Sequence, residues 1–118
     1  MEEEYSIFLG TQLGQPGSII YVAEQEGEVV GYVYAALEPR SWKDLRDAVG
    51  FIHDVMVDET VRGRGIAARL AEAASAWLEA QGAPRILLGT AAHNETAQRL
   101  FERLGFRRTM IEMTRERR

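Results

Sequence analysis

A turn of alternating arginine and glycine runs straight into an amphipathic stretch in the middle of the chain. In "VRGRGIA" (61–67) the two glycines allow a tight loop, and apolar residues then recur at helical spacing. The apolar stripe comprises Ile66, Leu70, Ala73, Ala74, Trp77 and Leu78. Gly82 and Pro84 follow it and favour the end of a helix. The sequence therefore predicts a helix over 66–81 that packs on a core by one face.

Strand patterns lie on both sides of this helix. Runs of β-branched and aromatic residues predict strands over 18–25, 29–38, 51–58 and 85–91, of which the first two form a hairpin. Strands that alternate with helices are typical of the α/β class. We therefore expect a single α/β domain over 1–118, with one mixed sheet flanked by helices.

A second helix and two weaker elements complete the expected order. Asn94 suits the N-cap of this helix and Gly105 the residue after its end, where Phe106 can close a hydrophobic contact. Apolar residues spaced four apart over 5–13 predict a short first helix. Partial alternation over 106–116 predicts a last strand.

The composition excludes several classes of site. The chain has no cysteine, which excludes disulfides, thiolate metal ligands and a cysteine nucleophile. Two histidines, His53 and His93, are too few for a histidine-rich site, and no metal is expected. A net charge of -4 gives no reason to expect a nucleic-acid partner. No apolar run approaches the ~18 residues of a membrane span, and "MEEEYS" is unlike a signal peptide, so the expected location is the cytoplasm.

The turn has the chemistry of an anion site. Unpaired N–H groups and the dipole at the start of a helix favour an anion, and Arg62 and Arg64 add positive charge. The alternative is a strand-to-helix turn that needs glycine only to change direction. That alternative leaves two arginines at the positive end of a helix unexplained. The turn therefore predicts phosphate or pyrophosphate binding.

Two common phosphate motifs fit this turn poorly. A P-loop requires Gly-Lys-Ser or Gly-Lys-Thr, and the chain has Arg64-Gly65-Ile66. A dinucleotide-binding fingerprint fits by its letters, because Gly63, Gly65 and Ala68 form G-x-G-x-x-A. The predicted strand ends several residues too early for it, however, and the ribose-binding acid expected about 20 residues later is missing.

The turn instead resembles the acyl-CoA-binding loop of the GNAT superfamily of N-acyltransferases. That signature, Arg/Gln-x-x-Gly-x-Gly/Ala, is matched by Arg62, Gly65 and Ala67 after the strand "FIHDVMVD". A second signature of the superfamily, Asn-x-x-Ala followed by an aromatic residue, is matched by Asn94, Ala97 and "LFERLGF". The two motifs occur in order and the resemblance covers roughly residues 18–114.

The resemblance implies acetyl-CoA as co-substrate and a set of residues that bind it. The strand over 51–58 is expected to splay away from that over 85–91, so that the pantetheine arm lies in the gap. Backbone groups around Val55, Met56 and Val57 are expected to pair with that arm. The backbone N–H groups of the turn are expected to take the pyrophosphate, and three residues of the second helix to lie by the arm. These residues are Arg62, Gly63, Arg64, Gly65, Ile66 and Ala67 in the turn, and Asn94, Ala97 and Phe101 in the helix.

The resemblance also implies transfer of the acetyl group to a primary amine. An amine is mostly protonated at neutral pH and needs a base, and the carbonyl oxygen needs a fixed donor, which the superfamily usually supplies as the N–H near Val55. The matching strand offers His53 and Asp54 as the base, expected on opposite faces, and a water chain ending on Glu38 is a third possibility. Asn94 is equally well explained as a simple N-cap.

Two departures from the superfamily bear on function. Many relatives have a tyrosine seven residues after the asparagine, and this chain has Phe101, which cannot donate a proton. The resemblance implies a GNAT-like, mostly antiparallel sheet, and the strand and helix with which family members usually begin are expected to be missing here. A more open acceptor site or a homodimer is therefore expected.

Three readings of the function follow. The first is an acetyl-CoA-dependent N-acetyltransferase acting on a small molecule or peptide amine. The second is a regulatory module that binds acyl-CoA without turnover, and the third a dinucleotide-binding domain. The sequence does not identify the acceptor, because fold and cofactor site do not determine it. Trp42, Asp44 and Asp47 either favour a cationic acceptor or form a solvated loop.

Overall fold

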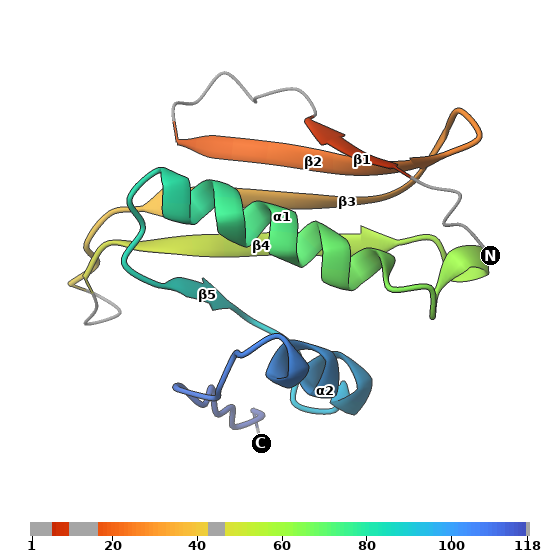
Figure 1. Cartoon of the computed structure of the whole chain (residues 1–118). Helices are drawn as coiled ribbons and strands as arrows, with labels where there is room; N and C mark the ends of the chain where they lie inside the picture. The colour runs from red at the N-terminus through yellow and green to blue at the C-terminus, as the bar shows by residue number, and fades with distance from the viewer. Residues whose placement is uncertain (1–5, 10–16, 43–46, 118) are drawn as a thin grey trace.

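The computed structural model describes residues 6–9, 17–42 and 47–117. These residues form one five-stranded sheet in the order β1-β2-β3-β4-β5 (Figure 1). Neighbouring strands are antiparallel from β1 to β4, and β5 pairs with β4 in parallel. The predicted α/β class with a mixed, mostly antiparallel sheet is confirmed. The strands are β1 (Ser6–Leu9), β2 (Ser18–Gln25), β3 (Glu28–Glu38), β4 (Val49–Val57) and β5 (Ile86–Leu88).

Helix α1 (Ile66–Ala80) crosses one face of the sheet and builds the core (Figure 1). Its Leu70 and Leu78 side chains are fully buried, in the same cluster as Val33 and Ile52 of the sheet. The helix ends in a Schellman turn at Gly82, whose φ is +94°. The amphipathic stripe therefore predicted both the existence of this helix and the face that it buries.

Helix α2 (Glu95–Arg103) lies beyond the edge strand β5 (Figure 1). Asn94 caps it, because its Oδ1 accepts a hydrogen bond from the Ala97 N–H at 3.1 Å. At the other end Gly105 has φ +96°, and the Phe106 N–H donates to the Phe101 carbonyl at 3.0 Å. The rings of Phe101 and Phe106 meet edge to face at 5.8 Å, which completes the expected hydrophobic contact.

Both weaker predictions at the ends of the chain are wrong. Residues 6–9 form strand β1, because this short run pairs antiparallel with the edge of β2, while the rest of the predicted helix lies outside the described residues. The described part of 106–116 forms no strand, and Met110 and Ile111 are 73% and 81% exposed. A strand needs a partner for its backbone groups, and this segment has none among the described strands.

Gly31 lies where β3, β4 and α1 approach most closely. A Cβ at Gly31 would lie 2.8 Å from the Met56 carbonyl oxygen and 3.2 Å from Leu70 Cδ1. We therefore expect Gly31→Ala to lower the free energy of unfolding by about 1–3 kcal/mol, since a backbone atom must move. Urea denaturation measures this, with Gly89→Ala, whose Cβ meets nothing within 4 Å, as the control. Equal stability of the two variants would contradict the close approach.

Candidate functional site

The arginine–glycine turn links the end of β4 to the start of α1. A short 3-10 helix, η1 (Glu59–Val61), precedes the turn, and Gly63 and Gly65 have φ of +85° and +78°. Gly65 is the N-cap of α1 and has no side chain to cap it. The first helical bond runs from the Arg69 N–H to the Gly65 carbonyl, which leaves the earlier N–H groups of the turn without a helical partner. The start of a helix with free N–H groups carries partial positive charge, which favours an anion.

The two arginines of the turn have different surroundings. Arg62 donates from Nε to the Val57 carbonyl at 3.3 Å and ties the turn to the end of β4. Arg64 is exposed and makes no hydrogen bond or ion pair within the described part of the chain. Hydrogen bonds from the Thr60 N–H and hydroxyl, together with nearby Arg62, lower the pKa of Asp58. Arg64 is therefore the side chain of the turn that is available to a ligand.

Strand β4 has an open edge next to this turn. Its pairing with β5 stops at Ile52 and Leu88, while β4 continues to Val57. In an antiparallel ladder, residue pairs that are hydrogen-bonded across the strands alternate with pairs that are not. Asp58 belongs to a hydrogen-bonded pair, because its N–H donates to the Val30 carbonyl of β3 at 2.7 Å. By that alternation the backbone groups of Val55 and Val57 point away from β3. An extended ligand can therefore pair with β4 where β5 has ended.

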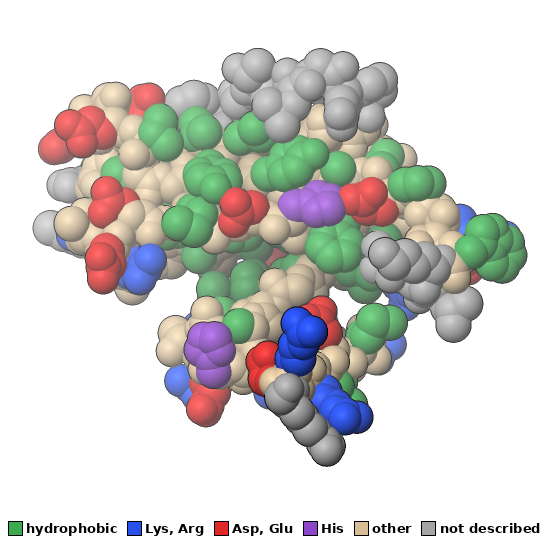
Figure 2. Space-filling view, turned by 180° about the vertical axis from the view of Figure 1, so that it is seen from behind, with side chains coloured by type: hydrophobic (Ala, Val, Ile, Leu, Met, Phe, Trp, Pro, Cys, Tyr) green, Lys and Arg blue, Asp and Glu red, His purple; other side chains and the backbone are tan. Residues whose placement is uncertain are grey.

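A β-bulge in β4 corrects the expected placement of His53 and Asp54. Tyr34 pairs with Asp54 and Ala35 with Ile52, so His53 is an extra residue in the ladder. The bulge breaks the period of two, and both side chains lie on the sheet face turned away from α1, not on opposite faces. Figure 2 shows this face, with a histidine between acidic side chains.

Three neighbours hold the His53 side chain. Its Nε2 pairs with Glu38 Oε1. Its ring stacks on Tyr34, with centroids 5.3 Å apart, and on Phe51, with centroids 4.7 Å apart. The aromatic neighbours were not predicted from the sequence, although Tyr32 and Tyr34 alternate along β3 and so share a face with each other.

Asp54 has a separate partner. The Tyr32 hydroxyl donates to Asp54 Oδ2 at 2.7 Å. This hydrogen bond, followed by burial and by the negative charge of Asp54, raises the pKa of Tyr32 above its ordinary value. A raised pKa in the folded state means that the contact stabilises the fold at lower pH and is lost as pH rises through that pKa.

The variant Asp54→Asn is expected to lower the pKa of Tyr32, because the negative charge is removed and the amide oxygen that remains is a weaker acceptor than a carboxylate. Phenolate absorbance followed through an alkaline titration measures the change, and one tyrosine should ionise at lower pH than in the wild type. Asp47→Asn is the control, since Asp47 pairs with Arg40 at 2.9 Å. A titration curve of Asp54→Asn that overlays the wild-type curve would contradict the contact.

Most of the chain matches a known protein family in sequence. The profile of the Acetyltransferase (GNAT) family matches residues 1–106. The chain belongs to the GNAT family.

Curated GNAT relatives match across the same region. N-acetylaspartate synthetase of Xenopus tropicalis is 37% identical over 93 residues, which are 79% of this chain and 32% of that protein. Uncharacterized N-acetyltransferase YycN of Bacillus subtilis is 30% identical over 91 residues, which are 77% of this chain and 56% of that protein. The chain thus spans about a third and about half of the length of these two relatives.

Solved GNAT structures share the fold. Aminoglycoside N-acetyltransferase AAC(6')-Iy in complex with CoA superimposes with a TM-score of 0.77 at 22% identity, covering 90% of this chain and 70% of that one. A putative acetyltransferase from Agrobacterium tumefaciens superimposes with a TM-score of 0.73 at 25% identity. The match covers 89% of this chain and 72% of that one.

The second GNAT motif lies on α2. The Oδ1 of Asn94 is occupied by the cap bond to Ala97, so its capping role is confirmed. Gln98 donates to the carbonyls of Ala91 and Ala92 at 3.0 and 2.8 Å and ties α2 to the chain that follows β5. Phe101 is half-buried with its ring on Phe106. The motif residues therefore share one helix on the far side of β5 from β4 (Figure 1).

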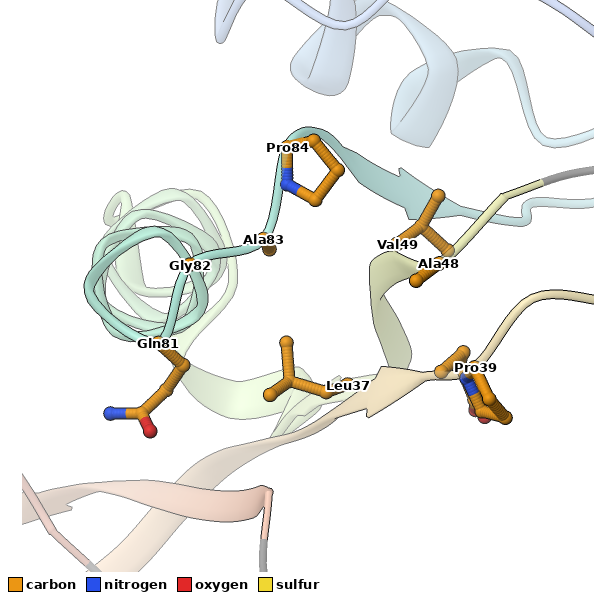
Figure 3. Close-up of a pocket in the computed structure, with 9 residues that line it drawn as sticks. Leu37, Pro39, Ala48, Val49, Gln81, Gly82, Ala83 and Pro84 are labelled. Carbon is orange, nitrogen blue, oxygen red and sulfur yellow. The ribbon is translucent and has the colours of Figure 1, made fainter.

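A pocket lies at the opposite end of α1 from the turn (Figure 3). It holds about 380 Å³ between the end of β3, the start of β4 and the chain after α1. Leu37, Val49 and Ala83 supply part of its mostly apolar wall. The 15 residues of α1, about 22 Å of helix, separate it from the turn, so this pocket is not the anion site.

Two described charges of the long connection between β3 and β4 pair with each other. Arg40 pairs with Asp47 at 2.9 Å and lies 5.5 Å from the ring centroid of Trp42, while Asp44 lies outside the described residues. The described side chains form no group of three or more that could hold a metal ion. No helix in the described ranges has the length and apolar character of a membrane span.

Proposed function

We propose that the chain is an N-acetyltransferase that moves an acetyl group from acetyl-CoA to a primary amine of a small molecule or peptide. The observation that carries the proposal is the uncapped, arginine-bearing start of α1 beside the open edge of β4, in a chain of the GNAT family. The amine attacks the thioester carbonyl directly, and CoA leaves as its thiolate.

The residues present fit acetyl-CoA. The N–H groups of the turn offer the pyrophosphate a positive helix end, and Arg64 adds an uncommitted charge. The backbone of Val55, Met56 and Val57 runs along the edge where the pantetheine arm is expected, although the Val57 carbonyl already accepts from Arg62. The remaining cofactor contacts proposed are the other turn residues, Arg62, Gly63, Gly65, Ile66 and Ala67, and Asn94, Ala97 and Phe101 of α2.

We propose His53 as the base and the Val55 N–H as the donor to the carbonyl oxygen. His53 presents an imidazole on the open face of β4, and imidazole accepts a proton near neutral pH. Asp54 is the weaker candidate, because its carboxylate already accepts the Tyr32 hydroxyl. Phe101 has no proton to donate to the leaving thiolate, so we propose that water protonates it.

The test is release of free CoA thiol from acetyl-CoA when amines are supplied. The panel contains amino acids, polyamines, an aminoglycoside and peptides with a free N-terminus. The name of one relative, N-acetylaspartate synthetase, points to an amino acid, and that of one structural neighbour to an aminoglycoside. We expect saturable CoA release with at least one class of amine. Binding of acetyl-CoA with no release from any amine would contradict the transferase proposal.

Binding of acetyl-CoA without release of CoA would instead support an acyl-CoA-binding module without turnover. The observation that favours this candidate is Phe101, which has a packed ring where many family members have a tyrosine hydroxyl.

A further inference from the structure

We propose that Glu38 is a positioning residue that sets which nitrogen of His53 accepts the proton. The proposal rests on the proposed function, in which His53 is the base. Glu38 pairs in the ladder with Val49, four residues before His53, yet its carboxylate reaches His53 Nε2. His53 alternates with Phe51 along β4, and both stack on the face away from α1, where the Glu38 carboxylate reaches the imidazole.

A carboxylate only accepts hydrogen bonds, so the nitrogen that faces Glu38 must hold the proton. The neutral imidazole then carries its lone pair on Nδ1, and Nδ1 is the atom that takes a proton from the amine. Without Glu38 the two tautomers would exchange freely, and part of the protein would present the wrong nitrogen. The carboxylate thus acts on the rate through His53 and does not itself touch the acceptor.

The surroundings keep this pair together. The His53 and Glu38 side chains are 35% and 29% exposed, which partly shields their contact from water. The stacked rings of Tyr34 and Phe51 restrict rotation of the imidazole. Arg40 is the nearest cation in sequence to Glu38, and it is engaged by Asp47. Among the described residues, Tyr34 of β3 lies against the ring, and the Tyr32–Asp54 pair lies on the same face.

The experiment combines nitrogen NMR of the histidine side chains with turnover, in the full chain. Glu38→Ala removes the acceptor, and Glu38→Gln keeps a carbonyl oxygen that can still accept from Nε2. Wild type is expected to show His53 as the Nε2–H tautomer, and Glu38→Ala a mixture. The kcat for CoA release should fall about tenfold in Glu38→Ala, while KM for acetyl-CoA stays unchanged. Glu38→Gln should restore most of the Nε2–H tautomer and most of kcat.

Glu28→Gln is the matched control, an exposed glutamate at the start of the same strand. It should leave the tautomer of His53 and kcat at wild-type values. An unchanged tautomer in Glu38→Ala, with or without a fall in kcat, would overturn the proposal. If wild type releases no CoA with any amine, the proposed function fails, while the NMR result still decides whether Glu38 holds the proton of His53 on Nε2.

Discussion

The substitution His53→Gln is expected to lower kcat/KM for acetyl transfer by about 10²- to 10⁴-fold. Glutamine keeps a polar side chain that can reach Glu38, but its amide cannot take a proton from the amine. Affinity for acetyl-CoA should not change, because the turn that we propose for the pyrophosphate lies beyond the end of β4. Initial rates of CoA release and calorimetry with acetyl-CoA measure the two quantities.

His93→Gln provides the matched control. His93 is the other histidine of the chain and lies exposed before α2, where its carbonyl accepts from the Glu95 N–H at 3.1 Å. This variant should keep the wild-type rate. Full activity in His53→Gln would contradict the assignment, and loss of activity in Asp54→Asn instead would make Asp54 the base.

The substitution Gly65→Val is expected to weaken acetyl-CoA binding by about 10- to 100-fold. Gly65 has φ +78°, a conformation that is strained for a β-branched residue by about 1–3 kcal/mol. Nothing in the described structure lies within 4 Å of its added Cβ, so the fold itself can hold the side chain. The loss arises because the turn relaxes away from the geometry that aims its N–H groups at the anion.

Gly82→Val carries the same strain at the other end of the same helix. Gly82 has φ +94°, and its added Cβ also meets nothing within 4 Å. It should lower the free energy of unfolding without changing the dissociation constant for acetyl-CoA. Equal loss of affinity in the two variants would mean that Gly65 acts through stability alone.

Local patterns predicted those parts of the fold whose determinants lie close together in sequence. The stripe from Ile66 to Leu78 and the glycines after both helices are such determinants. Both helices were predicted correctly, as were the end of α1 near Gly82 and the Schellman end of α2. Segment 106–116 was predicted wrongly, because a strand depends on a partner that its own sequence does not specify.

The faces of His53 and Asp54 were predicted wrongly for a related reason. Strict alternation along "FIHDVMV" places neighbouring side chains on opposite faces of the sheet. The bulge at His53 interrupts this alternation, and its position depends on the register between β4 and β3. Ile52 is buried in the core, and Val55 and Val57 are partly buried against it, although a spacing of three followed by two cannot stay on one face of a regular strand. The sequence shows that these three residues are apolar, but not that all three face α1. The contacts of His53 with Glu38 and Tyr34 also depend on that register.

Calorimetric titration of the full chain with acetyl-CoA tests most directly the claim that the arginine–glycine turn binds its pyrophosphate. We predict saturable 1:1 binding to wild type, weaker binding to Arg64→Ala, and no comparable binding of NAD. No heat with acetyl-CoA at millimolar concentration would contradict the account, and so would NAD binding as tight as that of acetyl-CoA.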